Sequence, residues 1–421
     1  MLGRLAVVNA GELVTLRGPQ VPRTREAMRE VGIVASGGFF VEDGVFTFVA
    51  TSNEVEDRIE PGDTVVDAGG RVVMPGFVDA HTHLVFAGDR FRDFEWRALG
   101  KSYAEIAQEG GGIRSTMRAT RLTGEDELLA LARKRSRWMM RCGTTTAEVK
   151  SGYGLTKADE MKMLRVIRSL GEEAAINMVP TFLGLHALPP EFEGDRSGYV
   201  EMMLDEALPQ VAAENLAHWA DIFVEEGYFS PDDAERLAER AKNLGLGLRM
   251  HVDQMQDSGG AALAARLGAA TADHLEFTSE SGIAALAEAG VVPVLLPGSV
   301  LGLGKNRYPN ARAMIEAGLP VVVATDFNPG SSPCPSLPTT LSLACTMMGM
   351  TPEEALTSAT VNAAYSLGLG HEVGSIEEGK RADFVIHDAE DWRETLVYSG
   401  RETPSDAYID GREITRRCST R

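Results

Sequence analysis

Residues 69–371 alternate short apolar runs with longer amphipathic stretches, and this alternation limits the possible folds more than any other feature of the chain. The runs have the length of β-strands, and the stretches have the length of helices. Eight strand–helix units predict an α/β fold, a (β/α)8 TIM-like barrel, with an active site at the C-terminal ends of its strands. The eight runs are residues 72–83, 144–151, 176–186, 220–227, 247–253, 271–277, 291–299 and 319–330.

The two ends of the chain have a different sequence pattern. Residues 1–68 and 372–421 carry short β signals broken by glycines, as in "GIVASGGFFVEDGVFTFVA" and "DAYIDGREI". Each end is too small to bury a good core alone, so we expect both ends to pair into one composite β-sandwich domain. That domain would stand beside the barrel of residues 69–371. Inside the barrel region, residues 232–245 and 259–268 are candidate helices, and each ends at a glycine.

The composition fits a globular enzyme and excludes several partners. Of the 421 residues, 44% are hydrophobic, and the formal net charge is −20. Such a charge repels nucleic acid and anionic membrane surfaces, so neither is an expected partner. No stretch approaches the ~20 apolar residues of a membrane span. The cysteines lack C-x-x-C spacing, which favours a reducing cytoplasm; they are Cys142, Cys334, Cys345 and Cys418.

Histidines and one aspartate stand at the ends of four apolar runs. His81 and His83 are two residues apart in "DAHTH", so both project to one side of an extended chain. His251 ends the fifth run, His274 the sixth and Asp326 the eighth. A single histidine at a strand end is usually structural, but this joint pattern predicts one divalent metal ion. The expected ligands are His81, His83, His251 and Asp326, which suit Zn²⁺ or Fe²⁺ with one position open.

A metal of this kind favours hydrolysis. A bound divalent ion lowers the pKa of its water to about 7, so it supplies hydroxide at neutral pH. The expected reaction is attack on a polarised carbonyl or amidine carbon. Asp326 could take the proton of the water as well as bind the metal, and His274 could orient the carbonyl or stabilise its oxyanion.

Several stretches resemble one known family. "PGFVDAHTHLVFAGDR", "GGGIRSTMRATR", "GTTTAEVKSGYGL", "TFLGLHALPPEF", "TADHLEF" and "ATDFNPGS" are spread across the barrel region. The H-x-H pair, the later histidines and the aspartate are similar to those of the amidohydrolase superfamily. Within it the chain resembles the imidazolonepropionase family, whose members open 4-imidazolone-5-propanoate to N-formimidoyl-L-glutamate in histidine degradation. The resemblance implies a small anionic substrate and a homodimer.

The resemblance also implies residue roles. The substrate-binding residues would be Arg90, Tyr103, Tyr153, His186, Asn328, Gly330 and Ser331, and the catalytic ones Asp326, His274 and Gln254. Arg90 suits the propanoate, because a guanidinium grips a carboxylate through two hydrogen bonds. Taken singly, most of these residues have an ordinary alternative as turn, surface or packing residues. Glu148 and Lys150 are expected to pair inside the barrel, as a structural ion pair or as a support for the Tyr153 loop.

Three features refine the resemblance: one distinguishes the chain from the deaminases of the superfamily, and two depart from the family pattern. Gln254 stands where many deaminases of the superfamily have a proton-shuttling glutamate, which argues against a deaminase. Leu185 replaces a small residue, and segment 298–312 lacks the expected aromatic residues. The changes at Leu185 and in segment 298–312 could reshape the pocket, and they leave the residues of the ring-opening chemistry in place. The alternatives are a related amidohydrolase acting on another cyclic amide or heterocycle, and a barrel without catalytic activity that serves in assembly.

Overall fold

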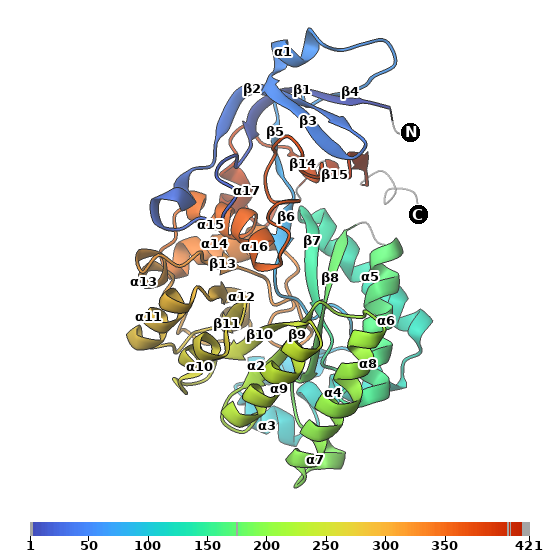
Figure 1. The fold of residues 1–421 in the computed structure, drawn as a ribbon, viewed down its shortest axis with the longest axis vertical. Helices are drawn as coiled ribbons and strands as arrows, with labels where there is room; N and C mark the ends of the chain where they lie inside the picture. The colour runs from blue at the N-terminus through green and yellow to red at the C-terminus, as the bar shows by residue number, and fades with distance from the viewer. Residues whose placement is uncertain (1–2, 174–175, 402–403, 405, 415–421) are drawn as a thin grey trace.

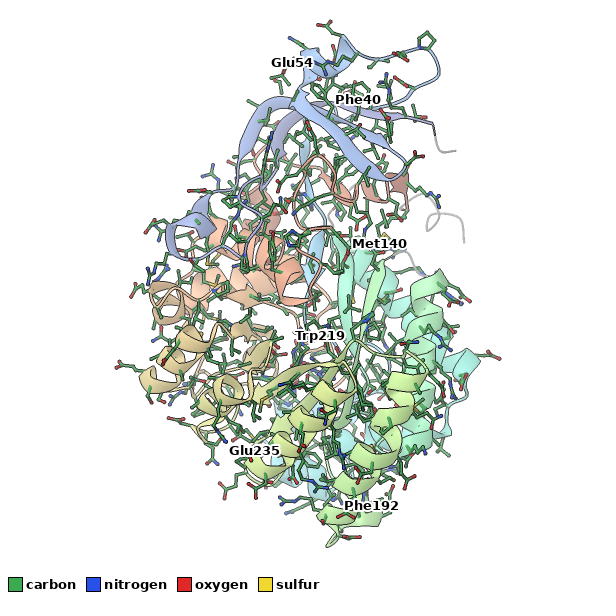
Figure 2. All side chains as sticks on the ribbon, viewed as in Figure 1. Phe40, Glu54, Met140, Phe192, Trp219 and Glu235 are labelled. Carbon is green, nitrogen blue, oxygen red and sulfur yellow. The ribbon has the colours of Figure 1, made fainter. Side chains whose placement is uncertain are left out.

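The computed structural model describes residues 3–173, 176–401, 404 and 406–414, without the side chains of residues 103, 104 and 107. It contains a barrel and a separate sheet at one end of it (Figure 1). Side chains fill the space between the barrel strands and the surrounding helices (Figure 2). None of the described helices has the length and apolarity that a bilayer crossing needs.

The barrel has the predicted eight parallel strands. Each pairs with the next in chain order, from the first strand to the eighth. They are β6 (Phe77–Asp79), β7 (Thr144–Lys150), β8 (Asn177–Leu185), β9 (Trp219–Val224), β10 (Gly247–Val252), β11 (Thr271–His274), β12 (Val292–Leu295) and β13 (Val322–Val323). The expected barrel is therefore confirmed, with one strand in each of the eight predicted runs.

Helices surround these strands. The two candidate helices form α9 (Pro231–Asn243) and α10 (Gly260–Leu267), and α10 ends at Gly268 with a φ of 65°. The others in the barrel region are α5 (Glu125–Arg141), α6 (Lys157–Glu173), the 3-10 helix η2 (Pro190–Phe192), α7 (Arg196–Glu201), the π-helical η3 (Met202–Ala207), α8 (Leu208–Ala213), α11 (Glu280–Ala289), α12 (Pro297–Gly302), α13 (Ala311–Glu316), α14 (Leu337–Met348), α15 (Pro352–Ser358) and α16 (Val361–Ser366). Between β6 and β7 the chain adds α2 (Phe91–Ala98), α3 (Tyr103–Gln108) and α4 (Ile113–Leu122).

The barrel closes at the backbone of the predicted metal ligands. The amide of His83 donates to the carbonyl of Phe327 at 2.9 Å, and the amide of Asp326 donates to the carbonyl of His81 at 3.0 Å. Thr82 and Phe327 form a parallel bridge at the same place. These bonds join the segments after the first and last strands, so closure brings "HTH" and "TDF" together.

The terminal segments form one mixed sheet. Its order is β16–β15–β14–β5–β1–β2–β3, with β4 on the other part of β1. The strands are β1 (Leu5–Val14), β2 (Ile33–Glu42), β3 (Val45–Thr51), β4 (Thr64–Asp67), β5 (Val72–Pro75), β14 (Phe384–His387), β15 (Asp406–Ile409) and β16 (Arg412–Glu413).

This sheet curls over its own core, in the manner of the expected sandwich. Phe384 on β14 and Phe39 on β2 are three places apart in the strand order. In a flat sheet that is about 14 Å, at about 4.8 Å per strand. Their ring centroids are only 4.9 Å apart, and Phe384 also meets Phe46 on β3 at 6.2 Å. The sheet must therefore fold back so that its two halves face each other.

The first predicted run, residues 72–83, divides between the two sheets. β5 pairs with β14 in the terminal sheet, and β6 begins the barrel two residues later. Gly76 stands at the break, where an added Cβ would lie 2.2 Å from the side chain of Thr145. The chain therefore passes from sheet to barrel at a point with no room for a side chain.

Candidate metal and substrate site

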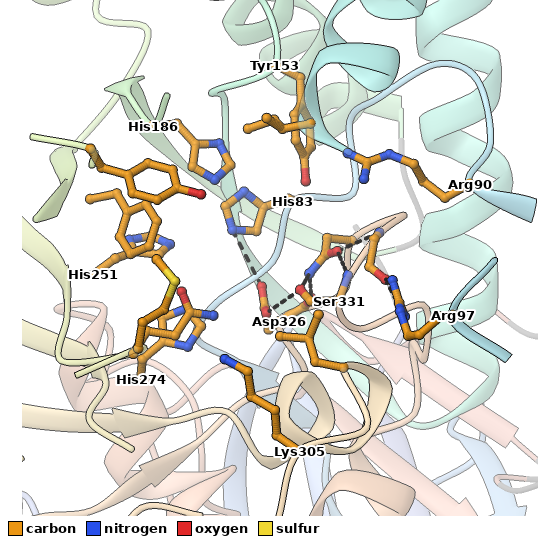
Figure 3. A pocket seen from close by; sticks show the side chains of 18 of the residues that line it. His83, Arg90, Arg97, Tyr153, His186, His251, His274, Lys305, Asp326 and Ser331 are labelled. Atoms are coloured by element: carbon orange, nitrogen blue, oxygen red, sulfur yellow. Dashed lines mark hydrogen bonds and ion pairs between the residues drawn. The ribbon is translucent and has the colours of Figure 1, made fainter. Parts of the chain in front are cut away.

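Five buried side chains meet at the C-terminal end of the barrel strands. His83 Nε2 lies 3.3 Å from His81 Nε2 and 3.5 Å from Asp326 Oδ1, and His81 Nε2 lies 3.6 Å from the same oxygen. The ring of His251 lies 4.6 Å from that of His81 and 5.4 Å from that of His274, centroid to centroid. Figure 3 shows His83, His251, His274 and Asp326 around the floor of one pocket.

Carboxylates behind two of the imidazoles fix their orientation. His81 Nδ1 donates to Asp273 Oδ2 at 2.6 Å, and His251 Nδ1 donates to Asp221 Oδ1 at 3.0 Å. With the proton on Nδ1, each Nε2 presents a lone pair to the centre. This arrangement is typical of metal-bound histidines, whose second nitrogen usually donates to a carboxylate or carbonyl.

The centre suits a cation. Burial, together with Lys150 near His81 and His186 near His83, holds the pKa of both histidines well below the usual value, so both are neutral ligands. Burial raises the pKa of Asp326 to about 6. His251 Nε2 is buried and has no hydrogen-bond partner in the described part of the chain. Lone pairs that converge without a donor between them are what a bound metal ion would satisfy.

The predicted ligands fall into two overlapping sets. One is His81, His83 and Asp326, the other is His81, His251 and His274, and within each set the ligand atoms lie within 4.8 Å of one another. All four predicted ligands thus border one centre, and His274, predicted to act on the substrate, borders it too. The site can hold a divalent metal.

A buried charge network lies beneath the centre. Lys150 Nζ lies 2.8 Å from Glu148 and 2.7 Å from Asp221, and 3.6 Å from Asp273, and Arg249 joins Glu148 and Asp273 at 3.7 and 3.8 Å. Burial opposes the charge of Lys150, but Asp221 and Glu148 raise its pKa above the usual value. The expected pairing of Glu148 with Lys150 is confirmed. Through Asp221 and Asp273 it reaches the histidines rather than the Tyr153 loop.

A pocket of about 300 Å³ opens above the centre (Figure 3). Most of the predicted substrate residues line it, as does Gln254; they are Arg90, Tyr153, His186, Asn328, Gly330 and Ser331. Tyr103 is the first residue of α3, but its side chain lies outside the described residues. The structure thus brings together every predicted site residue whose side chain it describes.

The loop that carries Tyr153 is held by one carboxylate. Glu160 on α6 is buried and accepts hydrogen bonds from the amides of Gly154 and Leu155, each at 2.8 Å, and of Gly152 at 2.9 Å. Gly152 has a φ of 104°, which favours glycine. Tyr153 is therefore placed by a turn that Glu160 fixes.

The "DFNPGS" loop is held by Asn328. Its side-chain oxygen accepts from the amides of Gly330 and Ser331 at 2.7 and 2.8 Å, and its amide nitrogen donates to the Asp326 carbonyl at 2.6 Å. Asn328 thus shapes the loop beside the metal aspartate.

Arg90 is held in place before any ligand binds. Its Nε donates to Thr116 at 2.7 Å, and its Nη1 lies 3.1 Å from Asp93. Both contacts fix the direction of the guanidinium, and Figure 3 shows its head at the pocket beside Tyr153.

His186 is a neutral group in the pocket. Burial and then His251 lower its pKa to about 3. Its Nδ1 donates to the carbonyl of Gly152 at 2.9 Å, which leaves Nε2 as an acceptor.

Sequence reasoning missed several residues of the site. Asp221 and Asp273 lie inside predicted strands, but a single charged residue in an apolar run does not show which side chain it will meet in the folded barrel. The pocket residues not predicted are Arg97, Lys101, Ser102, Ile113, Phe223, Tyr228, Met255, Leu303 and Lys305. Most belong to loops or helices between strands, where no periodicity points to the pocket.

Comparisons with known proteins agree with this geometry. The model of the amidohydrolase family matches residues 72–414. The chain is 52% identical to the imidazolonepropionase of Solibacter usitatus, across 98% of this chain and 99% of that protein. It is 49% identical to the imidazolonepropionase of Symbiobacterium thermophilum, across 91% and 90%. A 5-methylcytosine deaminase structure from Klebsiella pneumoniae shares the fold, with a TM-score of 0.72 at 18% identity over 97% of both chains. The chain is therefore a hydrolase of the amidohydrolase family and belongs, within that family, to the imidazolonepropionases.

Proposed function

We propose that the chain hydrolyses 4-imidazolone-5-propanoate to N-formimidoyl-L-glutamate, a step of histidine degradation. The observation that carries the proposal is a centre of imidazoles and a carboxylate that opens into a pocket lined by four cationic side chains. The ring amide of this substrate suits the centre, and its carboxylate suits the cationic wall. Relatives named imidazolonepropionase align over nearly the whole chain, which supports the same substrate.

The metal is proposed to be Zn²⁺ or Fe²⁺, since imidazole and carboxylate ligands suit both. His81, His83, His251 and Asp326 would hold it. When bound, such an ion lowers the pKa of a water molecule and polarises a carbonyl group.

Asp326 and His274 are the proposed acid–base residues. The Asp326 carboxylate, whose pKa burial raises to about 6, is ionised at neutral pH and can accept a proton. It would accept a proton from the water that attacks the ring carbonyl carbon. Burial lowers the pKa of His274, but Glu276 more than offsets this and raises it above the usual value, which favours a ring that donates to the developing oxyanion. The bond from that carbon to the ring nitrogen then breaks, and the nitrogen takes the proton.

The substrate is proposed to lie between Arg90 and the metal centre. Arg90 would bind the propanoate, and Tyr153 and His186 would hold the ring, with His186 Nε2 accepting a ring N–H. Gln254 carries a neutral amide, which cannot move a proton, so its proposed role is a hydrogen bond to the ring. Tyr103, Asn328, Gly330 and Ser331 remain proposed contacts.

The proposal includes a cytoplasmic homodimer. Cys142, Cys334 and Cys345 are free thiols, as in a reducing compartment, and Cys418 lies outside the described residues. Size-exclusion chromatography with light scattering tests the dimer.

The decisive experiment is turnover of 4-imidazolone-5-propanoate by metal-loaded protein. Arg90→Ala should raise KM for this substrate about tenfold or more, because a charged hydrogen-bond pair is lost. An imidazolone without the carboxylate should respond little to that substitution. Arg137→Ala, on the exposed face of α5, is the matched control.

Absence of turnover in metal-loaded protein would refute the assignment of 4-imidazolone-5-propanoate as the substrate. The alternative, an amidohydrolase acting on another cyclic amide or heterocycle, would be favoured by turnover of such a compound that Arg90→Ala leaves unchanged.

A further inference from the structure

The pocket wall is cationic in a chain whose formal net charge is −20. Four cations line the pocket, namely Arg90, Arg97, Lys101 and Lys305, and Asp326 is the carboxylate among the lining residues. Asp326 belongs to the metal centre, so the wall itself offers positive charge. An acidic protein that gathers cations at one concave site favours an anionic ligand there.

Three of these cations already have partners. Arg90 lies 3.1 Å from Asp93, and Lys101 pairs with Glu109. Arg97 donates to the carbonyls of Gly302 and Gly330, which ties α2 to the end of α12 and to the "DFNPGS" loop. These three side chains therefore hold the pocket wall together and also give it positive charge.

Lys305 differs from them. Within the described part of the chain, its ammonium group has no ion pair or hydrogen bond. It is exposed, and Figure 3 shows its amino group pointing into the pocket, toward the side where Asp326 and His274 lie. A lysine placed at a pocket without a carboxylate partner can bind an incoming anion as a flexible point charge.

The backbone around Lys305 is anchored on both sides. Arg97 holds the carbonyl of Gly302, three residues before it. Two residues after it, Arg307 donates to the Glu276 carbonyl at 3.0 Å and covers the ring of Phe277 at 4.3 Å. The amide of Lys305 itself donates to Val300 at 2.9 Å. The segment therefore presents Lys305 at a defined place in the pocket wall.

The proposed reaction creates an anion that the substrate lacks. Water adds through its oxygen to the ring carbonyl carbon, the bond from that carbon to the ring nitrogen breaks, and the nitrogen takes one proton of the water. The second proton passes to the basic amidine group that ring opening frees, and the carbon ends as a carboxylate. The substrate has one carboxylate and the product has two, and Arg90 is the proposed partner of the first.

We propose that Lys305 forms a second anion subsite, which binds the carboxylate produced by ring opening. This inference rests on the proposed function and adds a residue from the segment 298–312. The new carboxylate arises at the metal centre, on the side of the pocket toward which Lys305 points. Lys305 thus selects ligands with two carboxylates over ligands with one.

The test compares two probes that differ only in the second carboxylate. N-formimidoyl-L-glutamate has both groups, and N-formimidoyl-4-aminobutanoate lacks the one that ring opening creates. Their affinities for the metal-loaded enzyme are measured by calorimetry and by competition with substrate, for the wild type and for Lys305→Met, Lys305→Arg and Lys134→Met. Lys134 lies over Trp138 on α5 and does not line the pocket, so its substitution controls for the loss of one positive charge.

Lys305→Met should weaken the two-carboxylate probe about fivefold to tenfold, as for a solvent-accessible charge pair. The one-carboxylate probe should change less than about twofold. Lys305→Arg should retain most of the affinity, and Lys134→Met should match the wild type. Added salt should reduce the advantage of the two-carboxylate probe in the wild type and have little effect in Lys305→Met.

Two results would overturn the inference alone. If the wild type turns over the imidazolone and Lys305→Met binds both probes as tightly as the wild type, the subsite is refuted. An equal loss for both probes would mean that Lys305 acts on the shared carboxylate. A wild type that neither turns over the imidazolone nor binds either probe would instead overturn the proposed function, and the subsite with it.

Discussion

At the scale of single residues, the site depends on groups behind those that would touch a ligand. Asp221 is fully buried between His251 Nδ1, at 3.0 Å, and Lys150 Nζ, at 2.7 Å. It orients the imidazole by accepting a hydrogen bond from Nδ1–H. Burial would raise the pKa of Asp221, but His251 and Lys150 keep it below the usual value. Substituting such an outer group typically lowers metal affinity about 10- to 100-fold.

We therefore expect Asp221→Asn to lower metal affinity about 10- to 100-fold while the chain stays folded. The amide cannot offer both His251 and Lys150 a charged acceptor. Competition with a chromophoric chelator measures the affinity directly, without reference to activity. Asp205→Asn, at an exposed ion pair with Arg240, is the control. Unchanged affinity in Asp221→Asn would show that His251 does not depend on this carboxylate.

Glu160 gives a second prediction at this scale. Glu160→Gln replaces one acceptor oxygen with a donor, so at least one of the three loop amides loses its partner. We expect an unfolding free energy lower by about 1–3 kcal/mol and a KM that rises more than kcat falls, because Tyr153 is displaced. Steady-state kinetics and urea unfolding measure the two effects. Glu172→Gln, at an exposed position near the end of α6, should leave KM unchanged; a KM shift as large in that variant would refute the assignment.

The sequence predicted the residues that end strands and missed those that act through other residues. His81, His83, His251 and Asp326 were found because chemistry at the ends of barrel strands is visible in the pattern of runs. Asp221 gave no such signal, since its role appears only when β9 and β10 are paired. Tertiary packing decides which carboxylate oxygen meets which imidazole, and a single sequence does not reveal that packing.

At the scale of elements, the junction between β5 and β6 shows how close packing limits the chain. Gly76→Ala would place a Cβ 2.2 Å from the Thr145 side chain. We expect it to lower the unfolding free energy by about 1–3 kcal/mol, the usual cost of overpacking. Gly171→Ala inside α6 is the control, because its added Cβ would meet Met178 at an ordinary 3.6 Å and alanine favours the helix. Equal unfolding midpoints in denaturant for Gly76→Ala and the wild type would contradict this reading.

Element types were easier to predict from sequence than element boundaries. All eight runs contain barrel strands. Few other folds can bury strand-length apolar runs that alternate with amphipathic helices. The sequence predicts one strand over residues 72–83, because Pro75 and Gly76 could equally stand inside an apolar run or end one. The last strand is only Val322–Val323, because the backbone that follows it bonds to residues 81–83, which follow the first barrel strand.

At the scale of the whole molecule, Asp383 links the terminal sheet to the barrel. Its carboxylate accepts from Arg381 at 2.9 Å and from Asn177 of β8 at 3.1 Å. Burial nevertheless raises its pKa from 3.8 to about 6. The folded protein therefore favours the protonated form, and the contribution of Asp383 to stability is largest below pH 4 and declines as the pH rises to about 6.

Asp383→Asn should remove this decline. Relative to the wild type, its unfolding free energy should rise by about 3 kcal/mol between pH 4 and pH 7, at about 1.4 kcal/mol per pKa unit. Guanidinium unfolding of both proteins at several pH values measures the difference, and Asp126→Asn, exposed on α5, is the control. A constant difference between Asp383→Asn and the wild type would show that the carboxylate is ionised in the fold at pH 4.

The closure of the barrel at His81, His83 and Asp326 has a consequence for synthesis on the ribosome. A nascent chain that has emerged to residue 320 already carries every histidine of the centre. It lacks the carboxylate and both backbone bonds that close the ring of strands. The segment after residue 320 thus completes both the barrel and the metal centre. A chain truncated before this segment would have an open barrel and no activity.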